Sequence, residues 1–249
     1  MNKTSIYQSI QKNAALNKKQ LAVLIDPDKL TSESLINTIQ QCNSSNVDFI
    51  FYGGSLLHEP AKFELFLSEI KQHTKIPILL FPGSSMQVSK HADGLLLLSL
   101  ISGRNPEYLI GQHVIAAPYI KESGIEIVST GYLLIESGKS TTVSYISNTT
   151  PIPADKPEIA ACTALAGEML GLKTIYLDAG SGAQNCIDSE TISKVKKTIS
   201  CPLIIGGGIN TIEKAKNACK AGADIIVVGN AFEKSPELIM QIKKAISAL

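Results

Sequence analysis

The chain has 249 residues, of which 44% are hydrophobic and 18% are charged, and 23 Lys and Arg residues balance 22 Asp and Glu residues to a formal net charge of +1. This composition supplies enough apolar material for a sizeable core and excludes a disordered or fibrous chain. A net charge near zero provides no long-range field for nucleic acid or for an anionic membrane. We therefore expect no nucleic-acid partner, and any anionic ligand must be held locally.

Cysteine usage and hydropathy indicate where the protein works. The five cysteines are Cys42, Cys162, Cys186, Cys201 and Cys219. None of them falls in a CxxC spacing, which is typical of scattered, reduced thiols. The strongest apolar run, Gly94 to Ile101, is far shorter than the roughly 20 residues that a membrane helix needs, and the first twenty residues do not resemble a signal peptide. We expect a soluble, cytoplasmic protein with no integral membrane segment.

Short apolar runs recur along the whole chain, each bounded by polar or turn residues. Runs of four to seven nearly all-apolar residues are typical of strands that are buried on both faces of a parallel sheet. We expect strands at Leu21–Ile25, Val47–Phe51, Ile76–Phe81, Gly94–Leu98, Ile125–Val128 (running towards Ile135), Thr174–Leu177, Leu203–Ile205 and Ile225–Val228.

Helical patterns lie between these runs. We expect helices over Ser5–Leu16, Thr31–Cys42, Ala61–Gln72, Glu107–Ala117, Glu158–Leu170, Ser189–Ile199, Thr211–Ala221 and Pro236–Ala248. The start of the second is marked by Thr31, and the fourth by Asn105 as N-cap with Pro106 at the first helical position. Between the third and fourth strands, Ser84–His91 has room for only about two turns.

Eight strands alternating with helices in about 250 residues favour a single (β/α)8 TIM-type barrel over residues 1–249. It would be modified around strands 3 and 4 and carry an extra N-terminal helix. A doubly wound sheet is disfavoured because such sheets place a glycine-rich turn after the first strand. Here that strand ends in LIDPDK, which contains no glycine.

In such barrels the active site lies at the C-terminal ends of the strands, so these positions are the candidate site. The seventh strand ends in GGGIN and the eighth in GNA, which predicts a backbone cradle for a phosphate group. The AGSG turn after the sixth strand can add N–H groups and the Ser181 hydroxyl. The alternative is that these glycines only make tight turns, but two clusters on adjacent strands favour phosphate binding.

Polar side chains at the other strand ends suggest a metal and a base. Asp26 ends the first strand, where it could bind Mg²⁺, act as a base or hydrogen-bond a loop, and Ser55 at the next strand end could add a hydroxyl ligand. Asp178 beside the cradle is the best candidate for a general base, although it could instead order its own turn. Tyr176 could contact a ligand or pack between strands. His73, His91 and His113 fall on helical patterns and are expected at the surface.

Several motifs together resemble the geranylgeranylglyceryl phosphate synthases, the PcrB-like family of prenyltransferases, in the archaeal-type branch that has bacterial homologues. The motifs are LIDPDK, FYGGS, GYLLIESGKST, TTPIPADKPEIAACTALAGEMLG, YLDAGSGA, IIGGGIN and VVGNAFE. They span almost the whole chain in the family's order. The resemblance implies Mg²⁺-dependent transfer of a prenyl group, geranylgeranyl in the family's name, from prenyl diphosphate to the C3 hydroxyl of sn-glycerol 1-phosphate. An ether lipid precursor and diphosphate would be the products.

The resemblance also implies roles for individual residues. Asp26 and Ser55 match the family's Mg²⁺ positions. The glycerol-phosphate site is matched by Tyr176, Leu177, Asp178, Ala179, Gly180, Ser181, Gly182, Gly207, Gly208, Gly229 and Asn230. One departure concerns the proposed catalytic residue, since many relatives carry Glu where this chain has Asp178, which is one methylene shorter.

The prenyl tail needs an apolar groove, which we expect near Phe81 to Leu100, although packing of the barrel core would explain the same leucines. A sugar-phosphate isomerase or synthase on the same fold, or a non-catalytic phosphate-binding protein, are the alternative functions. We also expect a homo-oligomer and peripheral contact of the protein with a membrane, because the product is a lipid.

Overall fold

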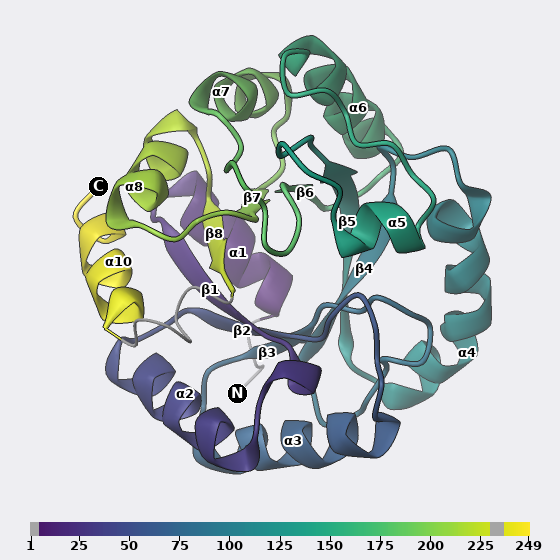
Figure 1. Ribbon diagram of the computed structural model, residues 1–249, viewed down its shortest axis with the longest axis vertical. Helices are drawn as coiled ribbons and strands as arrows, with labels where there is room; N and C mark the ends of the chain where they lie inside the picture. The colour runs from purple at the N-terminus through teal and green to yellow at the C-terminus, as the bar shows by residue number, and fades with distance from the viewer. Residues whose placement is uncertain (1–4, 230–236) are drawn as a thin grey trace.

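The computed structural model describes residues 5–229 and 237–249. Eight parallel strands close into a barrel in which each strand pairs with its neighbours in chain order and β8 pairs with β1 (Figure 1). The strands are β1 (Gln20–Ile25), β2 (Phe49–Tyr52), β3 (Ile78–Leu80), β4 (Gly94–Leu100), β5 (Glu126–Leu134), β6 (Thr174–Asp178), β7 (Leu203–Gly206) and β8 (Ile225–Val228). The predicted (β/α)8 barrel is confirmed.

Most of the helices and helical turns that the structure describes surround the barrel as an outer layer. The described helices and turns are α1 (Ile6–Ala15), η1 (Pro27–Lys29), α2 (Ser32–Ser44), α3 (Pro60–His73), η2 (Glu107–Gly111), α4 (Gln112–Ser123), α5 (Thr142–Ile146), α6 (Pro157–Met169), α7 (Ser189–Thr198), α8 (Ile212–Ala221) and α10 (Leu238–Ile246). The predicted helix starts have local causes: Thr31 forms a capping box with Ser34, and Asp188 caps α7 through the Thr191 amide. The short helix α5 was not predicted.

The connection from β3 to β4 contains no helix, which agrees with the predicted modification around strands 3 and 4; the segment 84–91, which has room for only about two turns, forms a loop. Its buried Gln87 ties the loop to the end of β2. The side-chain amide of Gln87 donates to the Gly54 carbonyl at 3.0 Å, and its oxygen accepts from the Gly83 amide at 3.1 Å. These hydrogen bonds tie the loop to the end of β2, so a loop occupies the place that a helix has in the other β-to-β connections.

The helix predicted over Glu107–Ala117 is longer and less regular than expected. Asn105 does cap it, since its side-chain oxygen accepts from the Glu107 amide at 3.1 Å. The first turn, η2, is π-helical, and α4 then continues through Pro118 to Ser123. Such π-turns are frequent at functional sites, and α4 forms a wall of the candidate site described below.

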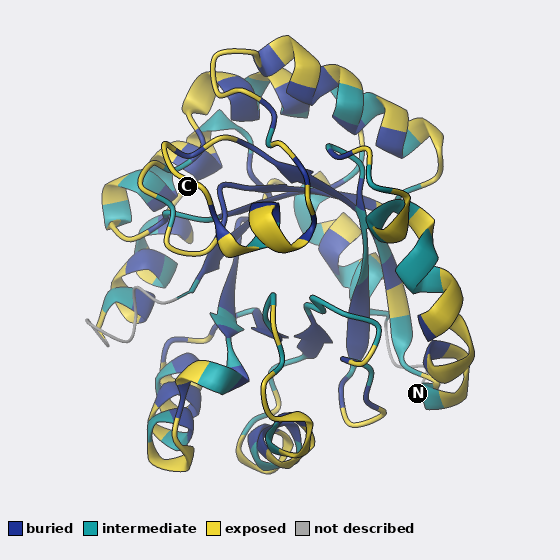
Figure 2. Cartoon of the chain, turned by 45° about the vertical axis from the view of Figure 1, so that its right-hand side comes forward, coloured by how far each residue is buried: buried dark blue, intermediate teal, exposed yellow. Residues whose placement is uncertain are grey.

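Side chains alternate along each strand between the barrel interior and the helix layer, as β-geometry requires. The interior is filled mainly by aromatic and aliphatic side chains, including Phe51, Leu96, Tyr132, Tyr176 and Ile204. The opposite faces of the strands pack against the helices in a second, larger cluster. Figure 2 shows the strands mostly buried, whereas most exposed residues lie on the outer sides of the helices and in loops.

The predicted extra N-terminal helix closes the N-terminal end of the barrel. Ile10 of α1 is fully buried in the interior cluster, and α1 lies across the barrel in the view of Figure 1. The helix is held there by the Glu126 carboxylate, which accepts from the amides of Ile6 and Tyr7 at 2.7 and 2.8 Å. A carboxylate at a helix N-terminus also complements the helix dipole.

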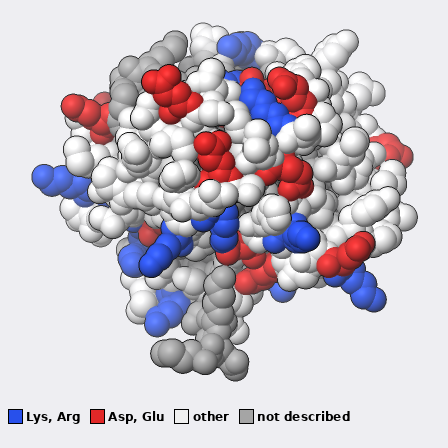
Figure 3. Space-filling view, turned by 90° about the horizontal axis from the view of Figure 1, so that it is seen from below, with Lys and Arg blue, Asp and Glu red and all other residues white. Residues whose placement is uncertain are grey.

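The surface matches the balanced composition. On the face in Figure 3, Lys and Arg side chains are interspersed with Asp and Glu, without a large patch of one sign. Within residues 5–229 and 237–249, no helix is both long and apolar enough to cross a membrane.

Candidate active site

Asp178 lies at the C-terminal end of β6 and points into the barrel interior, as β-alternation from Tyr176 dictates. One carboxylate oxygen accepts from the Tyr132 hydroxyl, and the other accepts from the Gly180 amide at 2.8 Å. Burial raises the pKa of Asp178 above its usual range, and these two hydrogen bonds offset part of that rise. A buried carboxylate with a raised pKa is suited to accept a proton near neutral pH.

Tyr132 is a candidate functional residue that the sequence reasoning missed. It lies on β5, and its side chain is 5% exposed and points inward. Burial and the nearby Asp178 carboxylate raise the pKa of Tyr132 well above its usual value, so the phenol stays protonated and donates. Its place in the GYLLI run, two residues before the interior-facing Leu134, was the available signal that it faces inward.

Three aromatic rings pack around this hydrogen bond. The ring centroids of Phe81 and Tyr132 are 6.0 Å apart, those of Phe81 and Tyr176 are 5.3 Å apart, and those of Tyr132 and Tyr176 are 5.4 Å apart. The packing of these rings holds Tyr132 in one orientation. Tyr176, for which ligand contact and packing were both open, is 1% exposed and packs inside the barrel.

The turns after β6 and β7 interlock through glycines. Gly180 and Gly207 have φ values of +90° and +81°, and a Cβ on Gly207 would lie 2.7 Å from the Gly180 nitrogen. The backbones approach closely enough for the Ala179 amide to donate to the Gly206 carbonyl at 3.1 Å. The glycines are therefore compatible with both interpretations. They are required by the tight turns, and they also leave backbone without side chains at the barrel mouth, where it could bind a phosphate.

The side chains of two predicted acceptor-site residues face away from the barrel interior. Leu177 and Ala179 are buried in the outer cluster between the strands and the helices, because they alternate with Tyr176 and Asp178. Only their backbone can face a ligand at the mouth. Gly208 and Gly182 also have positive φ values, and Gly229 follows β8; Asn230 lies outside the described residues.

The first two strand ends bring together the residues predicted to hold a metal. Asp26 follows β1, and Gly54 precedes Ser55 after β2. A Cβ on Gly54 would lie 3.0 Å from the Asp26 carboxylate carbon, so the glycine leaves room for that carboxylate. Asp28, in η1, has one buried oxygen with no hydrogen-bond partner, while the other accepts from the His58 amide at 3.0 Å.

This arrangement fits a magnesium ion that is shared with a substrate. Among residues 5–229 and 237–249, no group of three His, Cys, Asp or Glu side chains is placed to hold a metal. Mg²⁺ is commonly bound by one or two carboxylates together with waters and substrate phosphates. The Asp26 carboxylate, the unsatisfied Asp28 oxygen and the neighbouring Ser55 hydroxyl are oxygen donors of that kind. Binding of the metal remains a prediction.

An apolar cleft opens beside this mouth, in the region expected for a groove. The space in and in front of it, open solvent included, is about 880 Å³. The lining comes from the ends of β2 and β3, the loop after β3, strand β4, Tyr132 of β5 and the inner side of α4. Apolar lining side chains include Phe81, Val88, Leu98, Leu100, Ala116 and Ile120. The cleft reaches from Ser55 to Tyr132, and so touches both polar groups of the mouth.

His113 is not the plain surface residue that was expected. It lies on α4, lines the cleft, and its Nδ1 is buried without a hydrogen-bond partner. It lies three residues before Ala116 and seven before Ile120, so it shares the side of α4 that faces the cleft. His91 lies in a turn rather than a helix, with Nδ1 3.8 Å from the Glu64 carboxylate.

Together, the closed barrel and its mouth define a (β/α)8-barrel enzyme in which an apolar cleft meets a glycine-lined polar site at a buried carboxylate. Comparisons with known proteins give the family. The model of the PcrB family matches residues 14–247. The chain therefore belongs to the PcrB family, and it is a prenyltransferase.

Relatives match over nearly the whole chain. A geranylgeranylglyceryl phosphate synthase of Chitinophaga pinensis is 54% identical over 98% of this chain and 96% of its own length, and one of Spirosoma linguale is 51% identical over 92% of each. The crystal structure of (S)-3-O-geranylgeranylglyceryl phosphate synthase from Thermoplasma acidophilum, in complex with substrate sn-glycerol-1-phosphate, superposes with a TM-score of 0.94 at 30% identity. It covers 99% of this chain and 100% of that one.

Proposed function

We propose that the protein transfers a prenyl group, geranylgeranyl, from its diphosphate to the C3 hydroxyl of sn-glycerol 1-phosphate, with Mg²⁺ as cofactor. An ether bond forms between the C3 oxygen and the first prenyl carbon, the bond from that carbon to the diphosphate breaks, and the hydroxyl proton leaves. The observation that carries this proposal is the meeting of an apolar cleft with the polar mouth at Tyr132, which lines the cleft and hydrogen-bonds Asp178.

The acceptor is assigned to the turns after β6, β7 and β8. The Thermoplasma acidophilum relative was crystallised with sn-glycerol-1-phosphate, which supports this acceptor. Backbone N–H groups of glycine-rich turns can hold a phosphate without a basic surface, which agrees with the net charge of +1. Asp178 would then orient the C3 hydroxyl and accept its proton, as its raised pKa favours.

The donor is assigned to the cleft. Each methylene group that leaves water for an apolar wall contributes about 0.8 kcal/mol, so a long prenyl chain gains strongly from lying along Leu98, Leu100 and Ala116. The cleft also reaches Ser55, so a donor that lies along it would have its diphosphate end beside the predicted metal ligands. Asp26 and Ser55 would hold Mg²⁺, which when bound neutralises charge on the departing diphosphate. Orienting both substrates at one mouth contributes several kcal/mol in favourable cases.

The test is an assay for a lipid-soluble phosphate product. Labelled sn-glycerol 1-phosphate is incubated with Mg²⁺ and with prenyl diphosphates of several lengths, and organic extracts are counted. We expect label in the extract, most with the geranylgeranyl donor, and loss of product when Mg²⁺ is chelated. Asp26→Asn should raise the Mg²⁺ concentration needed for half-maximal rate, whereas Glu122→Gln, which removes a carboxylate from the last turn of α4 at the opposite end of the barrel, should not. No product with any donor length would refute the proposal.

We also propose that the protein is a cytoplasmic homo-oligomer. All five cysteines are free thiols, which suits a reducing compartment. Helix α4 exposes Val114, Ile115 and Tyr119 to more than half of their surface, and residues 108–120 contain no charged side chain. An exposed apolar face of this kind favours contact with a second copy. Light scattering after size-exclusion chromatography should give at least a dimer, and Val114→Glu should shift it towards the monomer.

A further inference from the structure

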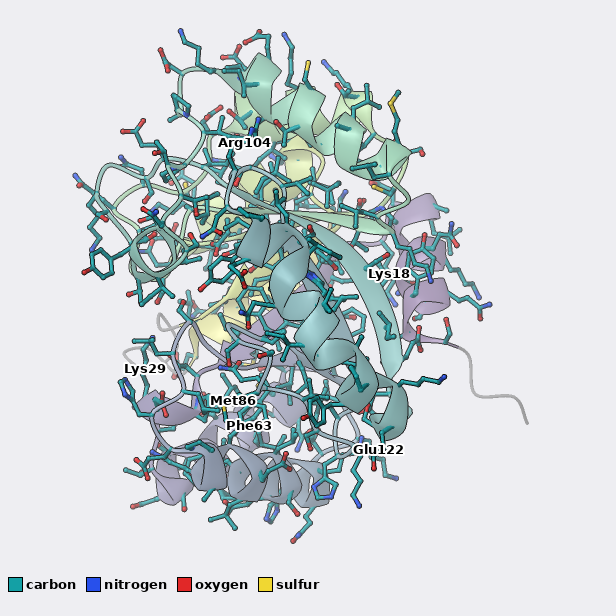
Figure 4. The ribbon with its side chains drawn as sticks, turned by 90° about the vertical axis from the view of Figure 1, so that its right-hand side faces the viewer. Lys18, Lys29, Phe63, Met86, Arg104 and Glu122 are labelled. Carbon is teal, nitrogen blue, oxygen red and sulfur yellow. The ribbon has the colours of Figure 1, made fainter. Side chains whose placement is uncertain are left out.

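Lys29 connects two parts of the barrel mouth that the proposed function assigns to different substrates. It ends η1, directly after β1, and its Nζ lies 2.9 Å from an Asp26 carboxylate oxygen. The same Nζ lies 3.5 Å from the hydroxyl of Ser181, in the turn after β6. Strand β6 is not a neighbour of β1 in the barrel, so this side chain spans the mouth. Figure 4 shows Lys29 at the end of the barrel opposite Lys18.

The positive charge of Lys29 lies where it could bind the negatively charged phosphate of the acceptor. The predicted acceptor residues from Tyr176 to Gly182 include the Asp178 carboxylate and no Lys or Arg. A phosphate monoester carries close to two negative charges near neutral pH. Backbone amides supply only partial charges, so the Lys29 ammonium group would add a full charge to those of Lys139 near Gly182 and Lys214 at the Gly208 carbonyl.

The pairing of Lys29 with Asp26 is incompatible with a metal on the same oxygen. Asp26 is 18% exposed at its side chain, so its charge is only partly screened by water, and Lys29 neutralises it in the structure. A divalent cation on that carboxylate would repel the ammonium group. Because η1 keeps the Lys29 backbone beside Asp26, the displaced Nζ stays within reach of the Ser181 turn.

We propose that Lys29 is a phosphate-binding residue: it pairs with Asp26 in the protein without substrates, and it moves to the acceptor's phosphate when a divalent cation binds Asp26. This inference rests on the proposed function for the identity of the acceptor. The metal and sn-glycerol 1-phosphate then bind cooperatively, because both favour the position in which the Lys29 ammonium group has left Asp26 for the phosphate. Such coupling is reciprocal.

The experiment measures binding, with Mn²⁺ as the metal probe. Free Mn²⁺ is followed by electron paramagnetic resonance, and sn-glycerol 1-phosphate binding is followed by calorimetry, each with and without the other ligand. For the unaltered protein we expect each ligand to tighten the other's binding by about fivefold or more. Lys29→Met should bind Mn²⁺ alone more tightly, since a competing cation is gone. It should bind sn-glycerol 1-phosphate about tenfold to a hundredfold more weakly.

Two further variants separate this role from local charge or folding. Lys139→Met removes a charge that lies beside the same turn, with Nζ 3.8 Å from a Cβ placed on Gly182; it should leave Mn²⁺ binding and the coupling unchanged. Lys29→Arg keeps the charge and should retain acceptor affinity within about threefold. Thermal denaturation checks that each variant is folded.

The outcomes are distinct. The inference would be overturned if Lys29→Met bound the acceptor as tightly as the unaltered protein does, or if it bound Mn²⁺ more weakly. It would also be overturned if the unaltered protein showed no coupling between the two ligands, a result that needs no variant. If the unaltered protein binds no sn-glycerol 1-phosphate at all, the proposed function fails instead. The Mn²⁺ measurements then still decide whether Lys29 competes for Asp26.

Discussion

Replacing Tyr132 by Phe should reveal how strongly its hydroxyl controls Asp178. The substitution keeps the ring that packs against Phe81 and Tyr176 and removes only the donor to a buried carboxylate. Hydrogen bonds to charged groups contribute about 1.5–3 kcal/mol. A loss of about 2 kcal/mol corresponds to a rise of about 1.5 units in the pKa of Asp178, at about 1.4 kcal/mol per unit. The rise adds to that already caused by burial.

Two measurements check this prediction. If Asp178 must be ionised to accept a proton, the acid limb of the kcat/KM profile should move to higher pH by about 1.5 units in Tyr132→Phe. The folded protein already binds a proton on Asp178 more tightly than the unfolded chain, so this group's stabilising contribution is present at low pH and is lost as pH rises through its raised pKa. Tyr132→Phe should therefore be destabilised most at the higher pH, by about 2 kcal/mol or roughly 4–8 °C, and less under acidic conditions.

The matched control is Tyr52→Phe. The Tyr52 hydroxyl is also buried, but it donates to the uncharged carbonyl of Phe63 at 2.9 Å, in the outer layer. Tyr52→Phe should lower the free energy of unfolding by about 1 kcal/mol at all pH values and leave the pH profile of kcat/KM unchanged. If Tyr132→Phe had the same pH profile as the unaltered enzyme, the reasoning that its hydroxyl tunes Asp178 would be refuted.

Three other substitutions test the rest of the site. Asp178→Asn should lower turnover by about a hundredfold or more with a melting temperature within a few degrees, since relief of charge burial offsets a lost hydrogen bond; near-normal turnover would remove the carboxylate from the mechanism. Gly207→Ala should lower the free energy of unfolding by about 1–3 kcal/mol and weaken acceptor binding. Gly124 has a similar positive φ but open space around it, so Gly124→Ala should lower the free energy of unfolding by less and bind the acceptor normally. Ala116→Phe should raise KM for a geranylgeranyl donor more than for a geranyl donor, while Ala117→Phe on the exposed side of α4 should not; equal effects would place the donor elsewhere.

The barrel and the location of its mouth were accessible from the sequence because they depend on local patterns. Runs such as Leu21–Ile25 and Ile225–Val228 are apolar at every position, which a strand buried on both faces requires. Counting eight of them predicted the closed barrel, and the residues after each run marked its C-terminal end. Asp26, Ser55 and Asp178 were all found in this way, and the order of motifs indicated the family.

Elements whose form depends on long-range contacts were predicted poorly. The loop after β3 is held by Gln87 against the end of β2; the sequence predicted a modification in this region but not this contact. His113 lines the cleft with Ala116 and Ile120, although it was expected at the surface. Strand alternation would have turned Leu177 and Ala179 outward, had it been applied residue by residue.

What the sequence by itself determined is therefore the fold class, the strand ends that carry chemistry, and the family. Only the tertiary structure decided which side chains meet at the mouth. Tyr132 and Asp178 are 46 residues apart, and Lys29 and Ser181 are 152 apart. Their contacts depend on strand register and on closure of the barrel, which bring distant segments to one end. Short-range patterns carry no information about such pairs, because each side chain alone is compatible with a turn, a cap or a core position.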